Sequence, residues 1–142
     1  MAASDLSLLT KRRLGPMFVV QFLGAFNDNL LKYALVFLAS FTIYRSDPGK
    51  AEQLAVISQA LFILPYFLFS AIAGQLADHI DKARIVRLVK VAEIAIMALA
   101  LAGFWYESIP ILLTCLFLMG VHSALFGPVK YSILPQHLRP NE

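Results

Sequence analysis

Hydrophobic residues are gathered into four long stretches, near residues 14–44, 54–77, 85–106 and 109–128. Short polar connections at 46–49 and 107–108 interrupt them. The hydrocarbon core of a bilayer is about 30 Å thick and is crossed by roughly 20 apolar helical residues, so each stretch is long enough for one crossing. Helices are favoured because every backbone amide in lipid must find its partner within its own segment. The pattern therefore predicts an all-α, polytopic membrane helix bundle with four transmembrane helices.

Composition excludes a soluble globular domain. Hydrophobic residues make up 59% of the 142 residues and charged residues only 15%, and the mean hydropathy is +0.72. Soluble domains carry about 25% charged residues.

The single cysteine, Cys115, lies inside the fourth stretch, where we expect it to pack rather than to form a disulfide. No metal-ligand spacing occurs, and we expect no cofactor.

The basic residues divide unequally between the two predicted sides of the membrane. One side carries Lys11, Arg12, Arg13, Lys82, Arg84, Arg87, Lys90, Lys130 and Arg139, whereas the other carries Arg45 and Lys50. Membrane proteins concentrate Lys and Arg on the cytoplasmic side, so the amino terminus is predicted to be cytoplasmic. This bias explains the net charge of +3 better than nucleic-acid binding does, because no soluble domain exists to present a basic surface.

Polar residues interrupt the first hydrophobic stretch about midway: Gln21, Asn27, Asp28, Asn29 and Lys32. A charge in hydrocarbon costs roughly 2.5 to 3.5 kcal/mol on insertion scales, so it requires a partner or an aqueous cavity. At about 100° per residue, Gln21, Asp28 and Lys32 fall within an arc of roughly 60°, with Asn29 on its border and Asn27 outside it. Asp28 and Lys32 are four residues apart and can partly neutralise each other. The stripe either lines a substrate or ion path or forms a structural ion pair inside the bundle.

The third stretch contains a second buried charge, Glu93. It follows Arg84 by about nine residues, which at 1.5 Å per residue is roughly 14 Å along the helix. Arg84, Arg87 and Lys90 have stems long enough to reach back to the membrane surface, and Lys90 is also the nearest partner for Glu93 on the same helix. Glu93 is therefore either a proton or cation site or the paired end of a structural cluster.

The fourth stretch carries a ridge of small residues for close helix packing, at Gly120, Ser123, Ala124 and Gly127. His122 lies beside this ridge and is interpreted as a hydrogen-bonded packing residue, with a proton relay as the alternative. Pro128 is expected to break the helix near Lys130.

The connection after the second stretch reads Gly74-Gln75-Leu76-Ala77-Asp78-His79-Ile80-Asp81-Lys82-Ala83-Arg84. It resembles the cytoplasmic loop signature of the major facilitator superfamily, G-x-L-A-D-R-x-G-R-K. The matching positions are Gly74, Leu76, Ala77 and Asp78; Lys82 replaces an arginine, and His79, Asp81 and Ala83 depart from the pattern. The resemblance implies a cytoplasmic gate in loop 78–84, formed by Gly74, Asp78, Lys82 and Arg84. The alternative is a solvated loop whose basic residues only set topology.

Three segments together resemble a narrower group: residues 21–32, residues 78–82 and the run Phe126-Gly127-Pro128-Val129-Lys130-Tyr131-Ser132-Ile133-Leu134-Pro135. They are similar to the amino-terminal half of the bacterial lysophospholipid transporter family, including forms fused to acyltransferase and acyl-carrier-protein synthetase domains. The resemblance implies a major facilitator fold in the bacterial cytoplasmic (inner) membrane, which moves lysophospholipids by alternating access. It further implies that Asn27, Asp28, Asn29 and Lys32 line the central path and that Lys130 meets a phosphate at the membrane boundary.

The four helices are then expected to form only part of the amino-terminal half of that fold, without catalytic chemistry of their own. Expected partners are the lysophospholipid, membrane lipids, the remainder of the transporter, and an acyltransferase or acyl-carrier-protein synthetase as partner or fused domain. Three alternatives stay open: the membrane domain of such a fused enzyme, a facilitator for another amphiphile or drug, and a small four-helix membrane scaffold.

Overall fold

A computed structural model of the chain describes residues 15–79 and 82–137, with side chains described except at 17, 73, 76–79, 82–83 and 128–137. Its helices are α2 (Gly15–Leu38), the π-helical segment η1 (Ala39–Ile43), α3 (Pro48–His79), α4 (Lys82–Trp105) and α5 (Ile109–His137). No strand occurs in the described part of the chain. The predicted fold class, an all-α membrane bundle, is confirmed.

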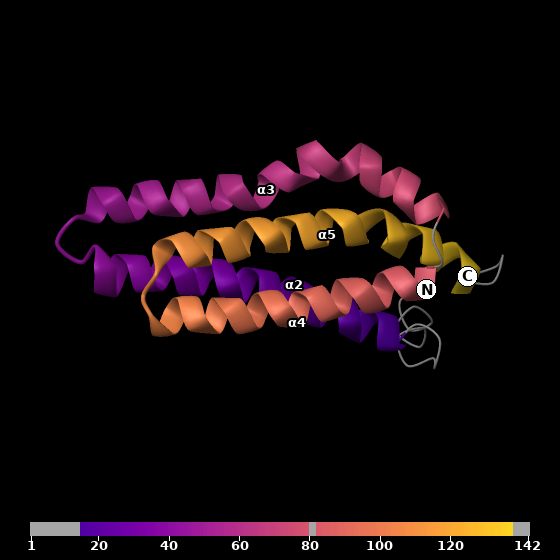
Figure 1. Cartoon of the computed structure of the whole chain (residues 1–142), viewed down its shortest axis with the longest axis horizontal. Coiled ribbons are helices and arrows are strands. Elements are labelled where there is room, and N and C mark those ends of the chain that lie inside the picture. Colours follow the sequence, from indigo (N-terminus) through magenta and orange to yellow (C-terminus); the bar gives the residue numbers. More distant parts are fainter. Residues whose placement is uncertain (1–14, 80–81, 138–142) are drawn as a thin grey trace, which may run out of the picture.

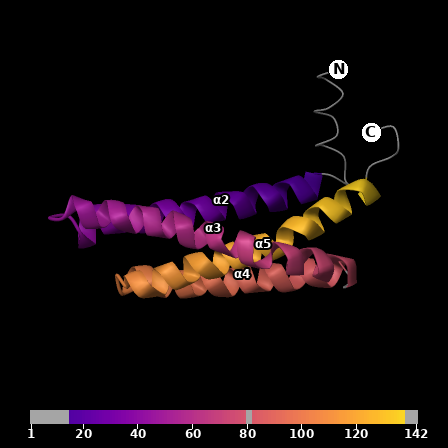
Figure 2. The same ribbon diagram turned by 90° about the horizontal axis from the view of Figure 1, so that it is seen from above.

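The helices form two hairpins that turn at the same end of the bundle. One turn joins η1 to α3, the other joins α4 to α5, and both lie opposite the start of α2 and the end of α5 (Figure 1). α5 makes the main contacts, packing along α3 and α4, while α2 contacts α3 and α5 less extensively. A second view shows the first half of α3 running beside α2 and its second half crossing to the side on which α4 lies (Figure 2). α5 is therefore the central helix of the bundle.

Local sequence explains the first turn. The backbone N–H of Tyr44 donates to the carbonyl oxygen of Ala39 at 2.7 Å, a wider loop than an α-helix makes, and this ends η1. The side chain of Asp47 then accepts from the backbone N–H of Lys50 at 3.2 Å, and Pro48 occupies the first position of α3. Asp before Pro is a favoured helix start, because the side-chain oxygen satisfies an amide that has no partner within the helix.

The observed helix bounds differ from the predicted ones in two places. α3 begins at Pro48 rather than at 54, because its cap lies in the polar connection before the apolar run begins. The expectation that Pro128 ends the last helix is wrong, since α5 continues to His137. A proline inside a helix removes one backbone hydrogen bond, and a long helix can absorb that loss. α3 likewise continues through Pro65 and changes direction in its second half (Figure 1).

Two segments of the described helices are long and apolar enough to cross a membrane, Pro48–Ile72 in α3 and Ile109–Gly127 in α5. α2 and α4 have 24 residues each, about 36 Å of helix, which exceeds the thickness of the hydrocarbon core. Both carry charged residues in their interior, at Asp28 and Lys32 of α2 and at Lys90 and Glu93 of α4. That α2 and α4 also cross the membrane, giving four crossings in all, therefore stays a prediction.

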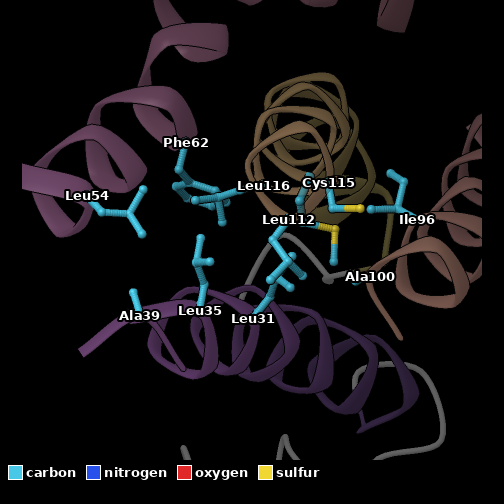
Figure 3. Packing of buried hydrophobic residues seen from close by; sticks show 11 residues of the cluster. Leu31, Leu35, Ala39, Leu54, Phe62, Ile96, Ala100, Leu112, Cys115 and Leu116 are labelled. Atoms are coloured by element: carbon cyan, nitrogen blue, oxygen red, sulfur yellow. The ribbon is translucent and has the colours of Figure 1, made fainter. Parts of the chain in front are cut away.

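The hydrophobic core lies between the four helices in the half of the bundle that holds the two turns. Figure 3 shows how side chains of α2, α3 and α4 converge on α5. The cluster contains Leu31, Leu35, Ala39, Leu54, Phe62, Ile96, Ala100, Leu112, Cys115, Leu116 and Met119. Cys115 is fully buried and free, as its expected packing role requires.

Small residues allow α5 to approach its neighbours closely. A methyl carbon built on Gly120 would lie 2.5 Å from the carbonyl oxygen of Phe62, so the backbones of α3 and α5 touch there. The predicted ridge of small residues is thus a packing surface at Gly120. At Gly127 nothing lies within 4 Å of such a carbon, because this end of the ridge borders an open space.

Candidate functional site

A cavity of about 290 Å³ opens beyond the core, among α2, α3, α4 and α5. We call it the central cavity. Its lining residues are Val20, Gln21, Gly24, Ala25, Asp28, Tyr66, Lys90, His122, Ser123, Phe126 and Gly127. One negative group, Asp28, and one positive group, Lys90, lie among apolar residues, glycines and uncharged polar residues. The lining therefore offers both signs of charge in a largely apolar setting.

Asp28 is held from the facing helix α5. The hydroxyl of Ser123 donates to Oδ2 of Asp28 at 2.8 Å. The other carboxylate oxygen, Oδ1, has no hydrogen-bond partner among the described residues. A carboxylate accepts several hydrogen bonds, and a buried one is costly unless they are made. Oδ1 is itself buried, so Asp28 presents its negative charge to the cavity rather than a freely exposed oxygen.

Four side chains beside the central cavity form what we call the Glu93 cluster: Asn27, Lys90, Glu93 and His122. The ammonium of Lys90 donates to Oε2 of Glu93 at 2.6 Å, and the amide of Asn27 donates to Oε1 at 3.1 Å. Nε2 of His122 lies 3.6 Å from Oε2. The Lys90–Glu93 pairing expected from the sequence is present. Asn27, which lies outside the polar stripe of α2, contacts α4 through Glu93. The cluster joins α2, α4 and α5 through one carboxylate.

Lys32 and Asn29 do not reach the central cavity. The ammonium of Lys32 lies 4.4 Å from the centre of the Phe62 ring on α3, a cation–π contact. Asn29 is exposed and donates to the carbonyl oxygen of Ala25 at 2.8 Å, one turn back on its own helix. Within the part of the chain that the structure describes, no ion pair joins Asp28 to Lys32. Asp28 and Lys32 therefore make no direct ion pair, and each side chain has a partner on another helix. Their partial neutralisation stays a prediction.

Only some of the residues predicted to line a substrate path lie at the central cavity. Gln21 and Asp28 line the central cavity, and Asn27 and Glu93 adjoin it. The side chain of Lys130 lies outside the described residues, as do those of the gate residues Asp78 and Lys82. Of the other two gate residues, Arg84 is exposed, and Gly74 has nothing within 4 Å of a built methyl carbon.

Three polar residues of the cavity, Ser123, Lys90 and Tyr66, were not predicted to line it. Ser123 was interpreted as one of a ridge of small residues, and only its contact with Asp28, 95 positions away, shows its polar role. Lys90 was expected to reach back to the membrane surface, but its ammonium points to Glu93 and the cavity. The signal for Lys90 was its spacing of three from Glu93.

Among the described residues no group of three or more His, Cys, Asp or Glu is placed to hold a metal ion.

Comparisons with known proteins agree with this architecture. Residues 46–142 match the family model described as transmembrane secretion effector, MFS_3. No solved structure matches the chain significantly.

The chain is also 32% identical over 118 residues to the lysophospholipid transporter LplT of Escherichia coli strain SE11. The same identity and length apply to the lysophospholipid transporters LplT of Escherichia coli O1:K1 / APEC and of Shigella boydii serotype 18. Each match covers 83% of this chain and 27% of the relative, so the chain spans about a quarter of the length of these curated relatives. The family match extends over most of the chain, and the chain therefore belongs to the transmembrane secretion effector family of the major facilitator superfamily.

Proposed function

We propose that this chain forms amino-terminal helices of a transporter that moves lysophospholipids across the bacterial inner membrane by alternating access. The observation that carries the proposal is the central cavity, which presents Asp28 and Lys90 in a lining of mixed polar and apolar side chains. A lysophospholipid such as lysophosphatidylethanolamine has an ammonium group and a phosphate on its head and one apolar chain. The similarity to proteins named lysophospholipid transporters supports this substrate class.

The size of the central cavity defines which part of the lipid it holds. Small-molecule pockets occupy about 300 to 1,000 Å³, and the central cavity of about 290 Å³ lies just below that range. It accommodates a head group rather than a whole lysophospholipid. The acyl chain then lies along an apolar surface outside the cavity. α2 offers such a surface beside Gln21, where Phe18, Phe22 and Phe26 are exposed.

Alternating access requires a second wall that these helices do not supply. Major facilitator folds bind their substrate between two six-helix halves and rock one half against the other. The exposed aromatic face of α2 and the open side of the central cavity provide a surface for the remaining helices. In this arrangement the amino terminus is cytoplasmic, and Gly74, Asp78, Lys82 and Arg84 gate the cytoplasmic side. The chain contributes binding and gating and catalyses no reaction itself.

The experiment that tests the proposal measures uptake of labelled lysophosphatidylethanolamine by cells or vesicles carrying the full-length protein. Asp28→Asn removes the negative charge and keeps the shape of the side chain. A hydrogen bond to a charged group is worth about 1.5 to 3 kcal/mol, so uptake at low substrate concentration should fall roughly tenfold or more.

The matched control is Glu52→Gln, which makes the same carboxylate-to-amide change at an exposed position in the first turns of α3. It should leave uptake unchanged. Wild-type uptake by an Asp28→Asn protein present at normal abundance in the membrane would contradict the role of Asp28. Absence of uptake by the wild-type protein would contradict the proposed substrate.

A further inference from the structure

Lys90 is the positively charged side chain among the described residues that line the central cavity. It stands on α4, whereas Asp28 stands on α2, so the two charges enter the cavity from different helices. The resemblance placed Lys32 in the central path and Lys130 at a phosphate on the membrane boundary. The ammonium of Lys32 instead lies over the Phe62 ring, on the core side of the cavity.

The ammonium of Lys90 is held in place but keeps donors to spare. It gives one hydrogen bond to Glu93 at 2.6 Å and lies 5.7 Å from the centre of the Phe126 ring. An ammonium has three donors, and the Lys90 side chain is 30% exposed. A methyl carbon built on Gly24 would stand 3.4 Å from Nζ, so the ammonium lies close to the backbone of α2, and the absence of a side chain at Gly24 permits this position.

Glu93 is itself fixed from two other helices. Asn27 of α2 donates to Oε1, and His122 of α5 lies near Oε2. A carboxylate anchored in this way sets where the ammonium on the same helix can stand. The cluster therefore orients Lys90 toward the cavity instead of toward the membrane surface.

We propose that Lys90 binds the phosphate of the transported lipid's head group and that Glu93, anchored by Asn27, is the residue that positions it. This inference rests on the proposed function and names the phosphate ligand of the same site. Asp28 supplies a negative group for the ammonium end of a zwitterionic head group, and Lys90 supplies a positive group for the phosphate end. A charge-assisted bond from an ammonium to a phosphate is stronger than a neutral hydrogen bond. The site then selects phosphate-bearing lipids over uncharged ones with the same acyl chain.

The test compares binding of two lipids to the purified full-length protein in detergent. Radiolabelled lysophosphatidylethanolamine carries the phosphate, and a monoacylglycerol with the same acyl chain lacks it. The wild type should bind the first at least tenfold more tightly. Lys90→Gln should lose most of that preference, with little change for the monoacylglycerol, and Lys90→Arg should keep it within about threefold. The ratio of the two affinities does not depend on the fraction of protein that folds.

Glu93 is tested as a positioning residue by combining variants. Glu93→Gln should reduce the preference for the phosphate-bearing lipid in the wild-type background but have no further effect in Lys90→Gln, because it acts through Lys90. A merely structural residue would weaken both lipids equally in both backgrounds.

The outcomes separate the two proposals. If the wild type binds lysophosphatidylethanolamine more tightly than monoacylglycerol and Lys90→Gln keeps this preference, the assignment of Lys90 is overturned while the proposed function stands. An equal loss of both lipids in Lys90→Gln would also overturn it. If the wild type binds lysophosphatidylethanolamine no better than a detergent-like control lipid, the proposed function itself fails.

Discussion

The close contact of α3 and α5 at Gly120 gives the sharpest test of how the bundle packs. In Gly120→Ala the new methyl carbon would lie 2.5 Å from the carbonyl oxygen of Phe62 and 3.0 Å from Cγ of Pro65. Ordinary contacts of such a carbon begin at 3.4 Å, so the carbonyl oxygen and the methyl carbon must separate by 3.4 − 2.5 = 0.9 Å. The nearest group is backbone, which cannot rotate away, and α5 must therefore shift relative to α3.

Overpacking of this kind costs about 1 to 3 kcal/mol. For a protein of roughly 150 to 250 residues, 1 kcal/mol shifts the melting temperature by about 2 to 4 °C, and a larger protein shifts less. The assay is thermal unfolding of the purified full-length protein in detergent, followed by the loss of its monodisperse elution peak. Gly120→Ala should melt several degrees below the wild type.

Gly127→Ala is the matched control for Gly120→Ala. It makes the same change on the same helix at a site where nothing lies within 4 Å of the new carbon. Both variants gain the same helix propensity, so the difference in melting temperature isolates the clash. Equal melting temperatures for the two variants would refute the close packing of α3 against α5.

Three further predictions test other parts of the structure. Cys115 is fully buried, so a thiol reagent should modify it only after unfolding, and modification of the native protein, detected by mass spectrometry of its peptide, would contradict the core. Gly24→Leu should fill the central cavity and abolish lysophospholipid uptake without lowering the abundance of the protein in the membrane, because Gly24 lines the cavity close to Lys90. Undiminished uptake would show that the central cavity is not the substrate path. The backbone N–H and the side chain of Lys50 donate to Asp47 and lower its pKa below the ordinary 3.8, so the contribution of Asp47 to stability is complete above about pH 4 and is lost as the pH falls through the lowered pKa. Asp47→Asn should remove this part of the pH dependence of the melting temperature. Identical pH profiles for the variant and the wild type would disprove the cap.

Helical periodicity in the sequence predicted the features of the site that lie within a single helix. Gln21 and Asp28 are seven positions apart, about two helical turns, so both side chains face the same way, and both line the central cavity. The Lys90–Glu93 pair, three residues apart on α4, was predictable for the same reason. The predicted turns at 46–49 and 107–108 follow from polar residues that end apolar runs, and the structure turns at both places.

Contacts between helices could not be predicted in this way. Whether Lys32 pairs with Asp28 or lies over Phe62 depends on how α3 crosses α2, and local spacing does not contain that information. Ser123 reads as a small packing residue until Asp28 is placed opposite it. Lys90 turns inward because a carboxylate anchored by another helix offers a closer partner than the membrane surface. In each case the deciding partner belongs to a different helix.

The central claim is that the polar stripe of α2 borders an aqueous path, whereas the adjoining aromatic face does not. Cysteine accessibility measures this directly, with Gln21→Cys and Phe22→Cys compared in a full-length protein whose other cysteines are replaced. Gln21 lines the central cavity, and Phe22 is 60% exposed on the neighbouring face of the same helix. In native membranes a hydrophilic thiol reagent should modify position 21, more slowly when lysophosphatidylethanolamine is present, and leave position 22 unmodified. Modification of position 22 in preference to 21, or of neither position from either side of the membrane, would contradict the account.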